Sequence, residues 1–344
     1  MSDLKPVLWM SDPLFGKHDP GVYHPEKRER FYAIEKMAEE IEEVELNRMK
    51  ARRATLDELL WVHGKGYIDF VNQNAGRVTH LDPDTGTSED SVEAAYLAAG
   101  AAVEMAKAVI EGDIKRAFGN LRPPGHHAEA NRAMGFCIFN NAALVAEYAV
   151  KVKGFKRVAV IDPDGHHGNG TQKQFYRRSD VLYASIHRWP FYPGTGTWEE
   201  VGTADGEGFN INFPFSTGAN DADFMAAFNQ VILPVLDQFE PQLIVLSAGF
   251  DAHEDDPLVG MDVTTQGFQA IAEALVGVAD KHSEGRLVAC LEGGYDLDAL
   301  ADSVRGTLRA FAGEKLNKNF GNPSFAAADA IERTKKYVSK YWKL

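Results

Sequence analysis

Residues 158–171 read VAVIDPDGHHGNGT and combine a predicted strand with a dense group of polar side chains. The apolar run 158–161 is short and β-branched, which is typical of a buried strand. Carboxylates and imidazoles follow at the strand end, where open α/β sheets bind their ligands. Because alternate side chains of an extended segment point the same way, we expect Asp162, Asp164 and His166 to share one side. One carboxylate and one imidazole there would form two-thirds of a catalytic site for a divalent metal.

The composition is ordinary for a soluble globular protein, with 44% hydrophobic and 25% charged residues. The net charge of −14 argues against generic nucleic-acid binding, which needs a positive footprint. No apolar run reaches the ~18 residues of a membrane span, and the start of the chain lacks a signal-peptide pattern. Cys137 and Cys290 lie in apolar runs, as reduced core thiols do. We therefore expect a cytoplasmic protein with no nucleic-acid or membrane partner.

Apolar runs alternate with helical patterns in the second half of the chain. The predicted strands are 158–161, 181–187, 209–213, 243–249 and 287–292, with helices near 221–238 and 266–281. Before them we predict a strand at 6–10, a helix starting at Pro25, a capping box at 55–58 and a helix over 91–111. This alternation indicates a parallel sheet covered on both faces. Without a linker or repeat, we expect one catalytic domain over residues 1–344.

Asp251 is the candidate for a third metal ligand. It comes first after the strand that begins at Leu243, so it matches the topological position of Asp164. Alone, Asp251 would fit a helix N-cap equally well. Two aspartates and one histidine leave coordination positions open, as a catalytic metal requires. This donor set suits Zn²⁺, and also Fe²⁺, Co²⁺ or Mn²⁺.

The loop 120–133 (NLRPPGHHAEANRA) contains the adjacent pair His126 and His127. Its prolines restrict the backbone, and its glycine allows a close approach. Such a pair on a rigid loop offers a proton acceptor and a proton donor beside a metal-bound water, although alone it is common in surface loops. Each imidazole needs a partner on its far ring nitrogen, and Asp162 and Asn169 are the natural candidates.

The stretch 292–296, EGGYD, follows the last predicted strand. Its two glycines let the loop come close to a ligand, and the Tyr295 hydroxyl is able to hydrogen-bond a developing oxyanion. Alone, this stretch would read as a strand-to-helix turn with a packing tyrosine.

Together these motifs resemble the histone deacetylase superfamily, which includes bacterial deacetylase-like amidohydrolases and acetylpolyamine amidohydrolases. The resemblance covers most of the chain in the family's order, through residues 122–143, 162–172, 247–258 and 292–297. The stretch from His24 to Arg30 resembles the family's N-terminal signature, and His63 with Tyr67 and Ile68 resembles a further element. It implies the arginase/deacetylase fold, an α/β fold with a mostly parallel eight-stranded sheet flanked by helices on both faces. The metal would lie at the strand ends.

The resemblance also implies a role for each candidate residue. The ligands of Zn²⁺ would be Asp164, His166 and Asp251. His127 would be the general base acting on the metal-bound water, with His126 as its electrostatic partner. Tyr295 would polarise the amide carbonyl. Asp162 would orient His126, and Asn169 would orient His127.

Two further sites follow from the same resemblance. A structural K⁺ or Na⁺ would be held by four backbone carbonyls and one hydroxyl. The carbonyls are those of Asp162, Asp164, His166 and Ile186, and the hydroxyl is that of Ser185. A narrow tunnel for the acylated chain would be walled by Phe136 and Tyr192 (or Phe191), with Gly135 and Leu258 completing its lining.

The residues between the ligands depart from the family pattern, because Pro163 and Gly165 replace residues that are usually bulky and apolar. Pro163 removes a backbone donor and Gly165 loosens the strand end, so we expect the local metal geometry or affinity to differ. Polyamine-specific relatives can place a glutamate seven residues after the last ligand. Leu258 stands there in this chain, which disfavours a polyamine substrate.

We therefore expect a zinc-dependent deacylase that hydrolyses the N-acyl amide, chiefly acetyl, of an acyl-lysine peptide or a small acylated amine. One alternative is an acetylpolyamine amidohydrolase. Another is a catalytically weakened acyl-lysine binding protein, for which Pro163 and Gly165 are the only support. An arginase-like ureohydrolase would need two metals and more bridging carboxylates. The oligomeric state stays open, with a homo-oligomer among the options.

Overall fold

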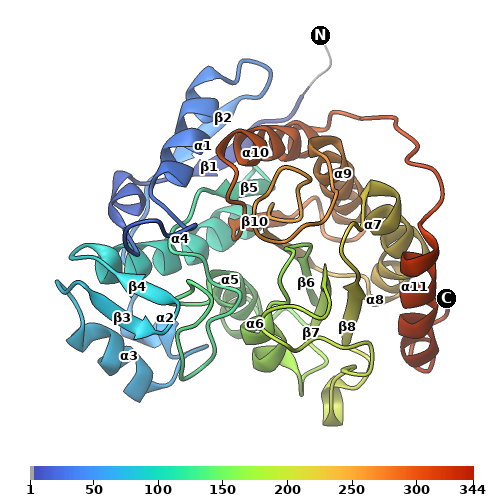
Figure 1. The fold of residues 1–344 in the computed structure, drawn as a ribbon, viewed down its shortest axis with the longest axis horizontal. Coiled ribbons are helices and arrows are strands. Elements are labelled where there is room, and N and C mark those ends of the chain that lie inside the picture. Colours follow the sequence, from blue (N-terminus) through green and yellow to red (C-terminus); the bar gives the residue numbers. More distant parts are fainter. Residues whose placement is uncertain (1–3) are drawn as a thin grey trace.

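A parallel sheet of eight strands forms the centre of the structure (Figure 1). The computed structural model describes residues 4–344, so residues 1–3 of the predicted domain lie outside it. The strand order is β2-β1-β5-β10-β9-β6-β7-β8, and each neighbouring pair is parallel. The strands are β1 (Val7–Met10), β2 (Leu46–Met49), β5 (Arg116–Gly119), β6 (Val158–Asp162), β7 (Val181–Arg188), β8 (Asn210–Phe215), β9 (Leu243–Ala248) and β10 (Leu287–Leu291). The predicted parallel sheet is confirmed.

The two faces of the sheet build two hydrophobic cores, because alternate strand residues point to opposite faces. In β9, Ile244 and Leu246 belong to one core, and Val245 belongs to the other. The first core is closed by α1 (Glu29–Glu40), α7 (Asp221–Ala227), α8 (Leu233–Phe239), α9 (Thr265–His282), α10 (Leu297–Ala312) and α11 (Phe325–Val338). The second is closed by α2 (Leu56–Leu59), α3 (Lys65–Gln73), α4 (Ser91–Glu111), α5 (Asn141–Glu147) and α6 (Asn169–Phe175). Helices therefore cover both faces, as predicted.

Several predicted elements differ from the structure in their bounds. The helix 91–111 and the capping box at Thr55 are confirmed. The helix predicted to start at Pro25 starts at Glu29, because Glu26 turns inward to pair with buried arginines. The predicted helix 221–238 is interrupted by a π-helical turn, Phe228–Ile232. Pro234 follows this turn and has no N–H for the regular ladder, which accounts for the interruption.

Short elements were missed by sequence reasoning. These are β2, β5, and an antiparallel hairpin of β3 (Thr79–Asp82) and β4 (Thr85–Thr87). Strands of three or four residues are too short to show a clear alternation of apolar side chains. The remaining short helices are 3₁₀ turns at Pro13–Lys17 and Ala204–Gly206, and a π turn at Tyr148–Val152 that extends α5.

The sheet order brings the predicted site together. The strands β5, β10, β9 and β6 are successive neighbours, and the loops after all four carry candidate residues. Because the strands are parallel, these loops meet at one edge of the sheet.

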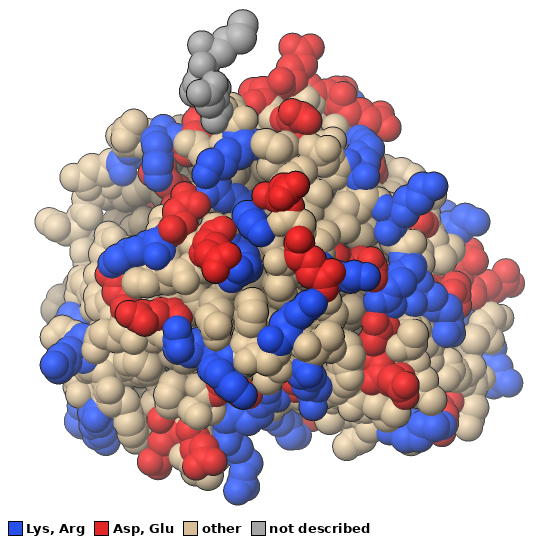
Figure 2. Space-filling view, turned by 180° about the vertical axis from the view of Figure 1, so that it is seen from behind, with Lys and Arg blue, Asp and Glu red and all other residues tan. Residues whose placement is uncertain are grey.

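The surface seen in Figure 2 carries acidic and basic side chains intermixed, without a broad basic area among the described residues drawn there. Between residues 4 and 344, none of the helices has both the length and the apolar character required to cross a bilayer. The cytoplasmic location stays a prediction. Cys137 and Cys290 are buried free thiols, as predicted.

Candidate active site

Asp164, His166 and Asp251 come together between the ends of β6 and β9. One ligand atom of each lies within 4.8 Å of the others. His166 Nδ1 is 2.7 Å from Asp251 Oδ2 and 3.4 Å from Asp164 Oδ1. Two buried carboxylates and one imidazole, with open positions beside them, fit a divalent cation of catalytic type.

The glycine-rich loops crowd around these carboxylates. A side chain at Gly249 would collide with Asp164, and a Cβ at Gly293 would lie 2.5 Å from Asp251 Oδ2. The backbone also fixes the orientation of Asp164, because Oδ2 accepts from Gly293 N (2.9 Å) and Oδ1 accepts from His166 N (2.8 Å). Such supports orient metal ligands and sharpen their geometry.

The protonation of this cluster reflects closely packed charges. Burial and the neighbouring carboxylate of Asp164 raise the pKa of Asp251 to about 7. Burial would also raise the pKa of Asp164, but His126 and His166 lower it well below the ordinary value. A divalent cation would stabilise both carboxylates in the ionised form that a ligand needs.

Asp162 does not join this cluster. The strand ends at Asp162, whose Oδ1 accepts from Asp164 N (3.3 Å), so the chain turns instead of continuing extended to His166. The carboxylate points elsewhere, since Oδ2 is 3.1 Å from His126 Nδ1 and 2.9 Å from the Tyr183 hydroxyl. The prediction that the three polar residues share one side is therefore wrong for Asp162.

His127 forms a pair with Asn169. Its Nδ1 lies 2.8 Å from Asn169 Oδ1, and Asn169 Nδ2 donates to Glu129 Oε1 (3.1 Å), which fixes the orientation of the amide. The amide oxygen therefore accepts from His127 Nδ1–H, which leaves the lone pair on Nε2. Burial and the cationic neighbours His126 and His166 hold the pKa of His127 well below its usual range. His127 is thus a neutral proton acceptor.

The pKa of His126 is shifted in the opposite direction to that of His127, although the two rings lie side by side with 4.0 Å between centroids. Burial lowers its pKa, but the carboxylates of Asp164, Asp162 and Glu292 raise it well above the ordinary value. Neighbouring groups whose environments separate their pKa values are typical of acid–base pairs.

Tyr295 faces the same site from the loop after β10. Its backbone N–H donates to Asp256 Oδ2 (2.7 Å), and its ring packs edge-on against Phe136, with 6.0 Å between centroids. Burial raises the pKa of the phenol well above its usual value, so it remains a hydrogen-bond donor.

Sequence reasoning missed the residue that holds this loop in place. Arg30 is fully buried and donates to Gly294 O (2.6 Å) and Glu292 O (2.5 Å). Its guanidinium lies 5.1 Å from the centre of the Tyr295 ring, and Glu26 balances its charge at 2.8 Å. The sequence signal was its place at the end of the stretch from His24 to Arg30, which resembles the N-terminal signature of the family.

A cavity of about 260 Å³ connects these groups to the surface. It is lined by Asp84, His127, Gly135, Phe136, His166, Phe191, Tyr192, Leu258 and Tyr295. All four predicted tunnel residues line it, and both aromatic candidates, Phe191 and Tyr192, contribute. Phe191 stacks on His166, with centroids 5.2 Å apart, and Tyr192 meets His127 edge-on at 5.2 Å.

Asp84 is the lining residue that sequence reasoning did not single out. It lies between β3 and β4, and its Oδ1 accepts from Gly135 N (2.9 Å). Gly135 has φ +56°, and a side chain there would collide with the ring of His127. The hairpin thus brings a carboxylate to the cavity from a part of the chain without a chemical motif.

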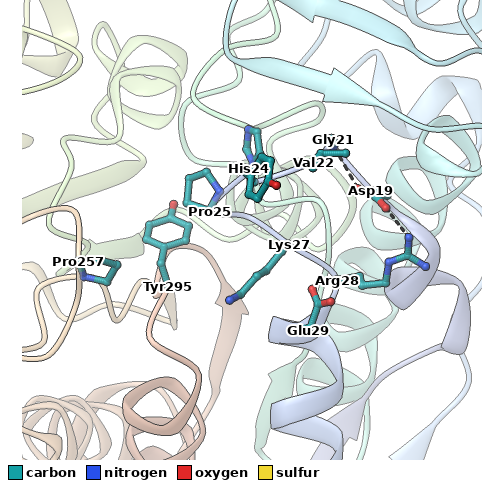
Figure 3. Close-up of a pocket in the computed structure, with 11 residues that line it drawn as sticks. Asp19, Gly21, Val22, His24, Pro25, Lys27, Arg28, Glu29, Pro257 and Tyr295 are labelled. Atoms are coloured by element: carbon teal, nitrogen blue, oxygen red, sulfur yellow. Dashed lines mark hydrogen bonds and ion pairs between the residues drawn. The ribbon is translucent and has the colours of Figure 1, made fainter.

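A wider cavity of about 490 Å³ adjoins the first at Tyr295, which lines both (Figure 3). Its other walls are Pro257 and the loop 19–29, where Asp19 pairs with Arg28. Val22 and Tyr23 at the tip of this loop are exposed.

The remaining predicted residues lie near β7. Ser185 is paired with Asp162 in the β6–β7 register, and Ile186 follows it. The Ser185 hydroxyl donates to His187 Nδ1 (2.8 Å), because His187 Nε2–H is engaged by Gly196 O.

Comparisons with known proteins agree with this geometry. The Histone deacetylase domain matches residues 24–311. A probable deacetylase of Archaeoglobus fulgidus is 37% identical over 345 residues, which cover 95% of this chain and 96% of that protein. Histone deacetylase HDA1 of Candida albicans is 38% identical over 93% of this chain, but the match spans only 41% of that longer protein.

Among solved structures, the crystal structure of the HDA15 HD domain superposes with a TM-score of 0.92 at 34% sequence identity. The match covers 98% of this chain and 95% of the other. The fold predicted from the sequence motifs is confirmed by this similarity.

Proposed function

Because the chain belongs to the histone deacetylase family, we propose that it is a zinc-dependent deacylase acting on the N-acyl amide of a lysine side chain or a related amine. Family membership and the deacetylase relatives support deacetylation as the reaction. The observation that carries the proposal is that His127, Tyr295 and His166 of the metal cluster line one narrow cavity. A base, an oxyanion donor and a metal ligand therefore face the same small volume.

The metal ligands in this proposal are Asp164, His166 and Asp251. The buried donor set fits Zn²⁺, and it also suits Fe²⁺, Co²⁺ and Mn²⁺. When bound, such a cation supplies Lewis-acid polarisation of the carbonyl and lowers the pKa of water. We also propose that the carbonyls near Asp162 and Ile186, with the Ser185 hydroxyl, hold a structural K⁺ or Na⁺.

The chain's own residues move the protons. His127 Nε2 takes a proton from the attacking water, and Asn169 keeps the ring in the accepting tautomer. The Tyr295 hydroxyl donates to the tetrahedral oxyanion, and the positive charge of His126 stabilises it further. Collapse of this intermediate breaks the C–N bond, and an imidazolium protonates the leaving amine.

The cavity supports an extended aliphatic substrate. Phe136, Phe191 and Tyr192 form aromatic walls, and Leu258 adds an apolar side chain at the position where polyamine-specific relatives can place a glutamate. An acyl-lysine peptide therefore fits better than an acetylpolyamine. A catalytically weakened binding protein remains the alternative from a different functional class.

The test is a side-by-side assay of acetyl-lysine peptides, acetylpolyamines and longer acyl-lysines, using protein as purified, treated with a chelator, and reloaded with Zn²⁺. We expect peptide hydrolysis that the chelator abolishes and Zn²⁺ restores. Preference for polyamines would replace the substrate assignment. Tight binding of acyl-lysine without turnover would identify a binding protein.

A further inference from the structure

Gly165 leaves a space in the metal-ligand loop that a residue of a distant loop fills. A Cβ placed on Gly165 would lie 2.5 Å from Val259 Cγ1, 2.8 Å from Val259 Cγ2 and 3.1 Å from Asp251 Oδ1. Val259 is fully buried, so its methyl groups cannot swing into solvent. The loop after β6 and the loop after β9 thus pack against each other without a gap at this point.

This packing surrounds a hydrogen bond that orients a metal ligand. Gly165 N donates to Asp251 Oδ1 (2.6 Å), which leaves Asp251 Oδ2 facing His166 Nδ1 at 2.7 Å. The N–H of Gly165 thereby selects which oxygen of Asp251 faces the cluster. A shift of Gly165 away from Val259 would rotate this carboxylate.

Arg188, the last residue of β7, forms hydrogen bonds to both Gly165 and Val259. Its backbone N–H donates to Gly165 O (3.0 Å), and its guanidinium donates to Val259 O (2.5 Å). The guanidinium also lies 4.2 Å from the centre of the Phe191 ring, which stacks on His166. One side chain therefore connects both ligand loops and the tunnel wall.

We propose that Val259 and Arg188 are positioning residues that hold Gly165 against Asp251 and so set the metal affinity of the site. This inference rests on the proposed metal site. It assigns to Val259 a role in ligand geometry, because its methyl groups occupy the place of the side chain that position 165 lacks.

The test exchanges the methyl groups between the two loops. Val259→Ala opens a gap beside Gly165, and Gly165→Ala forces a Cβ against Val259, so each should weaken Zn²⁺ binding about tenfold. In the double variant, the new Cβ occupies the space that the two methyl groups leave. Its dissociation constant should return to within about threefold of the parent, as residues in contact are non-additive.

Two more variants separate positioning from general stability. Val235→Ala removes equal bulk from a fully buried site on α8, which contributes no residue to the candidate site. It should lower the melting temperature and leave Zn²⁺ affinity unchanged. Arg188→Met keeps the stem over Phe191 but loses the bond to Val259 O, so the Zn²⁺ affinity should fall several-fold.

Zn²⁺ dissociation constants come from competition with a chromophoric chelator, and melting temperatures from the metal-free proteins. Variants that melt lower but bind Zn²⁺ like the parent would overturn the inference, as would additive losses in the double variant. A parent that binds no Zn²⁺ would overturn the metal site and this inference together. A parent that binds Zn²⁺ without hydrolysing any amide would overturn the proposed reaction, while the affinities still decide the role of Val259 and Arg188.

Discussion

Replacing Tyr295 with phenylalanine removes one oxygen atom from the candidate site and little else. The loop position of Tyr295 is fixed through its backbone N–H, which donates to Asp256 Oδ2 (2.7 Å), and not through the hydroxyl. The ring is held by Phe136 and by the guanidinium of Arg30, and both contacts survive in phenylalanine. The substitution should therefore leave folding and metal binding close to those of the parent.

The expected loss lies in the chemical step. A hydroxyl that donates only to the developing oxyanion stabilises the transition state more than the bound substrate. Losing one such donor costs about 10²–10³ in turnover, or roughly 3–4 kcal/mol. Because the phenol stays protonated, this loss should not depend on pH across the neutral range.

The assay compares kcat, KM and bound Zn²⁺ for the parent and Tyr295→Phe with an acetyl-lysine peptide. We expect kcat to fall by the stated factor, with KM and the metal content nearly unchanged. Asp256→Asn is the matched control for loop position, because it weakens the acceptor of Tyr295 N and retains the hydroxyl. Full turnover by Tyr295→Phe would refute the oxyanion role.

Three further perturbations follow from the geometry. Asp251→Ala removes one of three ligands, so Zn²⁺ affinity should fall more than about 100-fold, and metal analysis after dialysis checks this. His127→Gln removes the base, so kcat should fall by about 10²–10⁴ with metal retained; an unchanged rate would exclude this base. His63 donates to Glu129 O and accepts from Asn140 N, and burial lowers its pKa to about 4 from the ordinary 6.5. Since only the unfolded chain takes up this proton between pH 6.5 and 4, the unfolding free energy should fall by about 1.4 kcal/mol per pH unit there, roughly 3 kcal/mol in all. Unfolding free energies from urea titrations at several pH values check this. Plotted against pH, they should change less steeply for His63→Gln than for the parent, and equal slopes would contradict the lowered pKa of His63.

The clustering of Asp164 and Asp251 was predictable because each follows directly after a strand. Asp164 and Asp251 each follow a strong apolar run, and the ends of parallel strands converge at one edge of a sheet. That β6 and β9 are neighbours was not predictable from the runs themselves, because strand order depends on packing between distant segments. The motif order of a known family supplied this missing information.

The burial of charged side chains could not be predicted from the sequence. Arg30 and Arg122 look like surface residues, yet both are fully buried around Glu26. A buried ion becomes tolerable only when its partners are in place, and the partners here lie up to 96 positions apart. No local pattern indicates such compensation, so the support of the Tyr295 loop appeared only in the structure.

Compensation by residues that are distant in the sequence also bears on Pro163 and Gly165, the unusual residues of the ligand loop. Pro163 lies beyond the paired residues of β6, which end at Asp162 on the β7 side and at Ile161 on the β9 side. Its missing N–H therefore costs the sheet no hydrogen bond. Gly165 lacks a side chain, but Val259 fills the vacant space from the opposite loop. From the sequence alone, both substitutions suggest a loosened metal site, because the compensating residue lies 94 positions away. In the folded chain, neither Pro163 nor Gly165 gives a physical reason for weak metal binding. The Zn²⁺ affinity of the Val259 variants tests this conclusion directly.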